Sequence, residues 1–243
     1  MWLETLEMLI CRISQEQRTA LRKRLRRLCR PAWLGTLRST KPLSDDWGFD
    51  RGTAVDRYYI EGFLARHAND IQGRVLEIGF NIYTRRFGGD RVKQSDVLHV
   101  DTSFPWVTIV ADLTHGDAIP SEIFDCIIFT QTLQCIYDIP AALATLQRGL
   151  KAGGVLLATF PGITQIPKTE PRWYWGFTRT SAERLFQEAF PDSIVEVKTY
   201  GNVLASTGFL YGLGVDELRQ DELEFHDPEY QMVITVRVVK RGK

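Results

Sequence analysis

The sequence carries no net charge that could attract a polyanion and no hydrophobic run that could cross a membrane. Its 30 lysine and arginine residues balance 30 aspartate and glutamate residues, so no overall field recruits nucleic acid. No apolar run approaches the ~20 residues of a membrane span, and the acidic residues in MWLETLEMLICRI do not fit a signal peptide. These absences favour a protein without a membrane span and without a nucleic-acid partner.

Cysteine and histidine are too few and too scattered for a metal centre. The four cysteines show no CxxC spacing and no nearby pair of histidines, which a structural zinc site would need. Cys126 lies inside the apolar run FDCIIFT, where we expect a buried structural thiol. Free thiols suit a reducing compartment. The sequence therefore predicts no bound metal and a cytoplasmic location.

The charge that is present is unevenly distributed along the chain. Residues 1–41 hold ten basic and three acidic side chains. Leucine and isoleucine recur over residues 2–28 with the spacing of one helical face. We therefore predict a basic amphipathic helical arm and linker over residues 1–45, followed by a separate domain over residues 46–243. Docking of the apolar helix face on a second copy or on a protein partner is a hypothesis for this arm.

Short apolar runs alternate with helical patterns from residue 74 onward. The expected strands are RVLEIG, DVLHVD, VTIVAD, FDCIIFT, GGVLLATFPG, SIVEVKTYG and YQMVITVRVVK. Helical patterns cover AVDRYYIEGFLARHAND, IPAALATLQRGL, TSAERLFQEAF and NVLASTGFLYGL. Continuous apolar strands separated by helices indicate a parallel sheet that is buried on both faces. The length of 243 residues suits one such α/β domain.

Acidic residues stand at three consecutive strand ends. The first four predicted strands end at Glu77-Ile78-Gly79, Asp101, Asp112 and Thr130-Gln131. Ligands of an open parallel sheet bind beyond the carboxyl ends of its strands. A carboxylate after the second strand can accept both hydroxyls of a ribose, and Asp112 could accept from an adenine amino group with Leu113 against the ring. For any one of these acids, a helix N-cap is the alternative role.

In this order, the motifs VLEIG, VLHVD, VADLT, FDCIIFTQTLQCI and LKAGGVLLATFPG resemble those of the class I S-adenosylmethionine-dependent methyltransferases, especially the type 11 group. The resemblance implies a Rossmann-like α/β/α sandwich with a mostly parallel seven-stranded sheet and an antiparallel last strand. It also implies S-adenosyl-L-methionine as cofactor. The resemblance further implies which residues contact this cofactor: Glu77 and Gly79 its amino acid part, Asp101 its ribose, Asp112 and Leu113 its adenine, and Gln131 its methionine. Thr130 and Tyr83 complete the candidate cofactor-binding set.

One stretch departs from that family. RVLEIGFNIYTRRFGG, residues 74–89, lacks the second and third glycines of the usual acidic-x-Gly-x-Gly-x-Gly pattern. Asn81 can adopt a left-handed conformation in their place, but the helix that follows is expected to be short, Thr84 to Phe87. We expect Tyr83 to fill volume beside the cofactor. Because a pyrophosphate needs close backbone approach and a helix N-terminus, the departure disfavours NAD and leaves a sulfonium nucleoside possible.

No motif specifies the methyl acceptor. Two segments are candidates for binding it, and each has a structural alternative. The loop KTEPRWYWGF contributes Trp173, Tyr174 and Trp175, either as a wall that stacks on a sugar or flat metabolite or as a lid over the cofactor. The segment DDWGFDRGTAVDRYY alternates Asp50, Arg51, Asp56 and Arg57 before Tyr58, either as a substrate contact or as a surface ion-pair network. No histidine stands out as a general base, so the catalytic residues stay unassigned.

The sequence predicts a methyltransferase that modifies a small polar metabolite, such as a sugar or a secondary-metabolite intermediate, by O- or N-methylation. Two rivals remain. One is a non-catalytic protein that keeps this fold and binds a partner through its N-terminal helix. The other is a nicotinamide-dependent oxidoreductase, which should show the missing glycines. The sequence leaves open the acceptor and the oligomeric state.

Overall fold

The computed structural model describes residues 14, 15, 17–19, 21, 25, 35–116 and 118–242. The chain divides into two compact units, Met1–Lys41 and Pro42–Lys243. The first unit includes a 3-10 helix at Gly35–Arg38. Most of the predicted amphipathic helix lies outside the described residues, so the arm and its docking role stay predictions. The cysteines at positions 11 and 29 also lie outside them.

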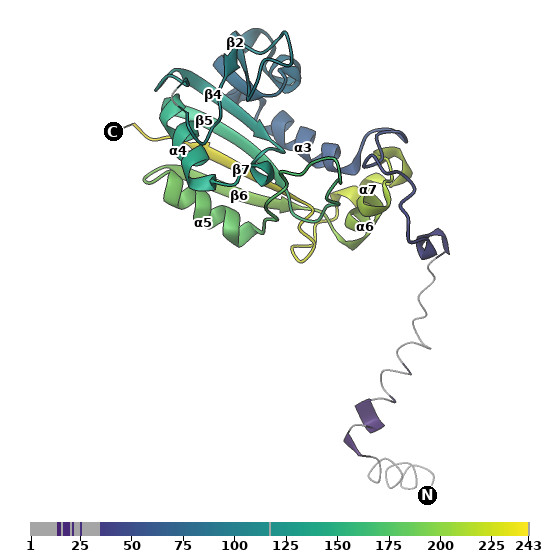
Figure 1. Cartoon of the computed structure of the whole chain (residues 1–243). Coiled ribbons are helices and arrows are strands. Elements are labelled where there is room, and N and C mark those ends of the chain that lie inside the picture. Colours follow the sequence, from purple (N-terminus) through teal and green to yellow (C-terminus); the bar gives the residue numbers. More distant parts are fainter. Residues whose placement is uncertain are drawn as a thin grey trace, which may run out of the picture. The chain divides into compact units, whose positions relative to one another are not determined.

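The larger unit is built on a seven-stranded sheet in the order β3-β2-β1-β4-β5-β7-β6 (Figure 1). The strands are β1 Gly73–Ile78, β2 Val92–His99, β3 Ile109–Val110, β4 Phe124–Thr130, β5 Leu150–Pro161, β6 Ile194–Tyr200 and β7 Val233–Val239. The first five pair in parallel, and β7 runs antiparallel to both of its neighbours. The structure confirms the predicted Rossmann-like sheet with an antiparallel last strand.

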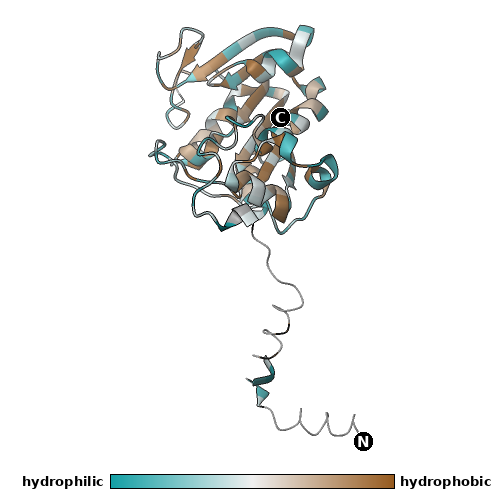
Figure 2. Cartoon of the chain, turned by 90° about the vertical axis from the view of Figure 1, so that its right-hand side faces the viewer, coloured by the Kyte–Doolittle hydropathy of each residue, from teal (hydrophilic) through white to brown (hydrophobic). Residues whose placement is uncertain are grey.

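Helices cover both faces of this sheet. They are α3 Val55–Arg66, α4 Ile139–Gly149, α5 Arg179–Ala189, α6 Val203–Tyr211 and α7 Gln220–Glu224, of which α7 was not predicted. Alternate strand residues point to opposite faces: Leu76 packs into a core with residues of α4 and α5, whereas Val75 packs into a second core with residues of α3 and α6. Figure 2 shows the hydrophobic residues concentrated in the central strands.

The ends of the helices are fixed by polar side chains. Asp138 accepts a hydrogen bond from the Ala141 amide at the start of α4, and Asn202 does the same for Ala205 at the start of α6. These caps satisfy amides that have no partner inside the helix. The segment before α4 includes Gln131 and Gln134, which line the pocket described below.

The structure also bears on the expected thiol, metal site and membrane span. Cys126 is completely buried in β4, as predicted, and burial raises the pKa of its thiol. In the part of the chain that the structure describes, no three His, Cys, Asp or Glu side chains are grouped so that they could hold a metal ion. No helix among those residues is both long enough and apolar enough to cross a membrane.

Candidate functional site

The carboxyl ends of β1 to β4 lie along one edge of the sheet. From β1 the strand order proceeds to β2 on one side and to β4 on the other, and such a reversal opens a crevice where α/β proteins bind ligands. The structure therefore places four sequence-predicted positions at this edge, namely Gly79 after β1, Asp101 after β2, Asp112 after β3 and Gln131 after β4.

Glu77 uses its carboxylate to shape the turn that follows β1. It is 3% exposed, and it accepts hydrogen bonds from the amide of Tyr83 at 3.1 Å and from the amide and hydroxyl of Thr84, both at 2.7 Å. Burial raises the pKa of Glu77, and these donors oppose that effect. The predicted contact between Glu77 and the amino acid part of the cofactor stays a prediction, because the observed partners of this carboxylate belong to the protein.

We expect Glu77→Gln to lower the free energy of unfolding by about 1–3 kcal/mol, since the new amide group would face backbone N–H groups and leave at least one unsatisfied. Urea denaturation followed by circular dichroism would measure the change. Glu188→Gln is the matched control: Glu188 is exposed and forms an ion pair with Arg184 on α5, so loss of its charge should cost less than about 0.5 kcal/mol. Equal stability of Glu77→Gln and wild type would contradict the structural role.

The turn itself combines one glycine with a stack of aromatic rings. Gly79 has a φ of +79°, and a Cβ built on it would meet no atom within 4 Å. Its carbonyl accepts a hydrogen bond from the indole of Trp106 at 3.0 Å. The Trp106 ring lies 5.6 Å from Phe80 and 4.9 Å from Phe104, both in stacked geometry. The turn after β1 is thus tied to the loop after β2. This stack was not predicted, although FPW, residues 104–106, stands shortly after the end of a strand.

The remaining residues of the turn differ in part from expectation. Asn81 does not adopt a positive φ; Gly79 supplies that conformation, and the Asn81 amide instead reaches the Ser95 hydroxyl at 3.3 Å. The expected left-handed Asn81 was therefore wrong. A π-helix at Thr84–Gly88 confirms that the helix after the turn is short. Tyr83 stands before it and interacts with the guanidinium of Arg57 on α3, which connects the turn to the pocket described below.

Asp101 and Asp112 have similar surroundings at their strand ends. Each side chain is 55% exposed. Asp101 Oδ1 accepts a hydrogen bond from the Ser103 amide at 2.9 Å and lies 3.0 Å from His99 Nδ1. Asp112 Oδ1 accepts from the amide and the hydroxyl of Thr114, both at 2.8 Å. These bonds lower the pKa of both carboxyl groups, so both are ionised at neutral pH.

Each of these carboxylates keeps its second oxygen available. The backbone amide donors described above reach Oδ1, and each side chain remains 55% exposed. Leu113 is 4% exposed and packs into the core, so it could meet an adenine ring only through its backbone. The cofactor roles of these residues stay predictions that the geometry allows.

Gln131, directly after β4, has strained backbone geometry. Its φ of +49° is uncommon for a residue with a side chain. The strain is held by hydrogen bonds from its amide to the Thr159 carbonyl at 2.7 Å and from Gln134 Nε2 to its own carbonyl at 2.9 Å. Such strain concentrates at functional sites and costs about 1–3 kcal/mol. Thr130, the last residue of β4, is half-buried behind it.

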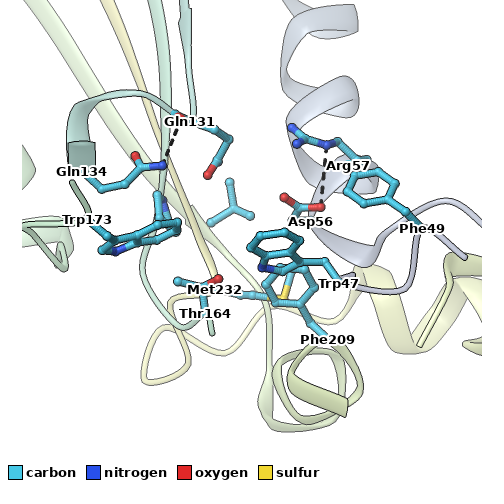
Figure 3. Close-up of a pocket in the computed structure, with 12 residues that line it drawn as sticks. Trp47, Phe49, Asp56, Arg57, Gln131, Gln134, Thr164, Trp173, Phe209 and Met232 are labelled. Carbon is cyan, nitrogen blue, oxygen red and sulfur yellow. Dashed lines mark hydrogen bonds and ion pairs between the residues drawn. The ribbon is translucent and has the colours of Figure 1, made fainter. Parts of the chain in front are cut away.

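A pocket of about 180 Å³ lies beside Gln131 (Figure 3). It is lined by Trp47, Phe49, Asp56, Arg57, Gln131, Gln134, Pro161, Thr164, Trp173, Phe209, Met232 and Val233. These residues come from the loop before α3, from α3, from the segment that follows β4, from the end of β5 and the segment after it, from α6 and from the start of β7. Asp56 and Gln131 face each other across it. Of the predicted substrate contacts, Asp56, Arg57 and Trp173 line this pocket.

The other candidate substrate contacts lie elsewhere. Tyr174 and Trp175 form an exposed aromatic cluster with Tyr137, and both donate backbone hydrogen bonds to the carbonyl of Gln134. Arg51 forms a bidentate ion pair with Glu217, which agrees with the surface ion-pair alternative. Asp50 is exposed, and its substrate role stays a prediction. Tyr58 borders a different pocket, on α3 beside Tyr200.

Comparisons with known proteins give one family match and solved structures of similar fold. Residues 61–158 match the family model of a methyltransferase domain. No curated protein matches the sequence. Among solved structures, a SAM-dependent methyltransferase from Archaeoglobus fulgidus is 11% identical, with a TM-score of 0.51 over 76% of this chain and 94% of that one. A protein assigned as a sarcosine dimethylglycine methyltransferase from Galdieria sulphuraria is 14% identical, with a TM-score of 0.53 over 76% and 85% of the two chains. At these identities the likeness shows the fold.

Proposed function

We propose that this chain, a class I S-adenosylmethionine-dependent methyltransferase, methylates a small polar metabolite in the pocket beside Gln131. The observation that carries the proposal is the position of that pocket. It opens next to the β1–β4 reversal, where the fold binds its nucleoside cofactor, and it is lined by both polar and aromatic side chains.

The residues along the strand ends fit the cofactor. Open space beside Gly79 leaves room for close approach of a ligand to the backbone, and the available oxygen of Asp101 can accept from ribose hydroxyls. Asp112 can accept from the adenine amino group in the same way. When bound, S-adenosylmethionine supplies an electrophilic methyl group on a sulfonium. The chain's own residues then have to position the acceptor and remove its proton.

The dimensions and chemistry of the pocket favour a small acceptor. A volume of about 180 Å³ accommodates a functional group or a small molecule, and nothing about the balanced net charge favours nucleic acid. The exposed rings of Tyr137, Tyr174 and Trp175 could stack on a sugar that extends from it. We further propose a cytoplasmic location and an interaction of the N-terminal arm with a second copy or a protein partner.

A melting experiment tests the cofactor. S-adenosylmethionine, or its demethylated product S-adenosylhomocysteine, should stabilise the protein by about 2.7 kcal/mol at a hundredfold excess over its dissociation constant. NAD should produce no shift, because the five-residue π-helix Thr84–Gly88 offers a pyrophosphate no regular helix N-terminus. A shift with NAD alone would support the oxidoreductase. No shift with any of the three would favour the non-catalytic rival that works through its arm.

A further inference from the structure

Asp56 is a carboxylate buried in the pocket without a hydrogen-bond partner for one of its oxygens. It is the second residue of α3, and its side chain is 13% exposed. Oδ1 accepts no hydrogen bond within the described part of the chain; its one ion pair there is a long one, with Arg57 Nε at 3.9 Å (Figure 3). Burial raises the pKa of Asp56. The charge of Arg57 opposes this shift only in part. An acid that served only the helix dipole would be expected at the surface.

Gln134, which lines the same pocket, also has a side-chain oxygen that accepts no hydrogen bond from the described residues. Its Nε2 donates to the Gln131 carbonyl at 2.9 Å, which fixes the orientation of the amide. Its Oε1 is buried and has no hydrogen-bond partner in the described part of the chain. Buried polar groups in proteins are usually satisfied, so two residues that line this pocket each hold an acceptor that still lacks a donor, and Asp56 is the charged one.

The walls of the pocket favour a cation. The indoles of Trp47 and Trp173 lie on two sides of it (Figure 3), and aromatic faces attract positively charged groups. Arg57 also lines the pocket, but its guanidinium is shared: besides the long ion pair with Asp56, it lies 5.6 Å from the centre of the Phe49 ring and interacts with Tyr83. No lysine, histidine or cysteine is among the residues that line the pocket.

We propose, on the basis of the function proposed above, that the methyl acceptor is an amine, bound as an ammonium by the carboxylate of Asp56. An ammonium brings up to three donors and a positive charge, whereas a hydroxyl brings one donor and no charge. The lining residues also favour an amine on chemical grounds. An aliphatic hydroxyl is far less acidic than an ammonium and would depend more on a strong base, and no histidine or lysine lines the pocket.

Asp56 then acts as a catalytic residue. One proton passes from the ammonium to the carboxylate, which leaves a neutral amine with a free lone pair beside a neutral acid. A nitrogen–carbon bond forms as the sulfur–carbon bond breaks, and the positive charge of the sulfonium passes to the nitrogen. Burial of Asp56 eases the proton transfer, because a raised pKa brings the carboxyl group closer to the amine in basicity. Asp56 afterwards releases its proton to solvent.

The test compares two probes of nearly equal shape, benzylamine and benzyl alcohol. Calorimetric titration of each into the full-length protein without cofactor should show benzylamine binding at least tenfold more tightly. Asp56→Asn, which keeps the shape and removes the charge, should abolish this preference. Asp46→Asn is the matched control: Asp46 is exposed and stands directly before Trp47, so removal of its charge should leave the preference intact.

The outcomes separate this inference from the proposed function. Equal affinity for the two probes, no binding of benzylamine, or a preference that survives in Asp56→Asn would each overturn the amine assignment. A normal melting shift with S-adenosylmethionine in the same preparations would then leave the methyltransferase function standing. If Asp56→Asn does not fold, the comparison of the two probes on wild-type protein still decides between an amine and a hydroxyl.

Discussion

Asp101→Ala is expected to weaken the binding of S-adenosylmethionine on the order of tenfold to a hundredfold while leaving the fold intact. The side chain is half-exposed at a strand end, where no packing depends on it. Hydrogen bonds to a charged acceptor are the strong ones, and one oxygen of Asp101 is available for them. Asp101→Asn should be milder, because an amide oxygen can still accept one bond. Isothermal titration calorimetry measures the dissociation constants of the wild type and of both variants.

The surroundings of Asp101 also determine the controls. His99 lies 3.0 Å from its carboxylate, so a His99 variant would disturb the same group. Asp90 is a better control, because it is exposed in the 3-10 turn at the opposite end of β2; Asp90→Ala should bind the cofactor normally. The Ser103 hydroxyl and amide are the main groups that lower the pKa of Asp101. The contribution of Asp101 to cofactor binding should therefore be constant around neutral pH and be lost only in strong acid. Unchanged affinity in a folded Asp101→Ala protein would show that the cofactor binds elsewhere.

Gly79→Ala should reduce cofactor affinity by a comparable amount. The added methyl group would project into open space beside the turn, which is the space assigned to the cofactor. Steric intrusion of this kind costs about 1–3 kcal/mol, which corresponds to roughly a fivefold to 150-fold loss of affinity. The substitution also strains the backbone, because φ is +79° and alanine disfavours that region by about 1–2 kcal/mol.

Gly153 provides a matched control for the strain. Its φ is +77°, and a Cβ built on it would also meet nothing within 4 Å. It lies near the start of β5, at the end of the sheet opposite to the proposed cofactor site. Both alanine variants should therefore lose similar stability in urea denaturation, but only Gly79→Ala should lose cofactor affinity in calorimetry. Normal affinity of Gly79→Ala would contradict the placement of the cofactor against this turn.

The sheet could be predicted from the sequence because its information is local. Apolar runs such as FDCIIFT specify buried strands, and the acids and the glutamine that follow them mark one edge of a parallel sheet. The order of the motifs supplied the rest of the fold, including the antiparallel β7. The confirmed short helix after Tyr83 was likewise predicted from the absence of glycines in that segment.

The pocket could not be predicted in this way. Its lining comes from segments more than a hundred residues apart, from Trp47 to Val233, and no periodicity records which of them meet. Asp56 was noted in the sequence only as part of a run of alternating charges; the absence of a hydrogen-bond partner for its Oδ1 appears only when its neighbours in space are known. Likewise, the ion pair of Arg51 depends on Glu217, which is distant in the chain. Tertiary contacts, rather than local propensity, determine these roles.

The turn after β1 has a consequence for how this sequence can change in evolution. Glycines give such a turn its shape through backbone freedom alone, and each can persist while its neighbours vary. Here the shape depends on pairs: Glu77 with Thr84, the Trp106 indole with the Gly79 carbonyl, and Phe80 with Trp106. Residues in contact covary, so relatives that lose Trp106 should also have replaced Phe80 or regained glycine. Positions on two separate loops are thereby inherited as one unit, and glycine spacing alone would fail to group such relatives together.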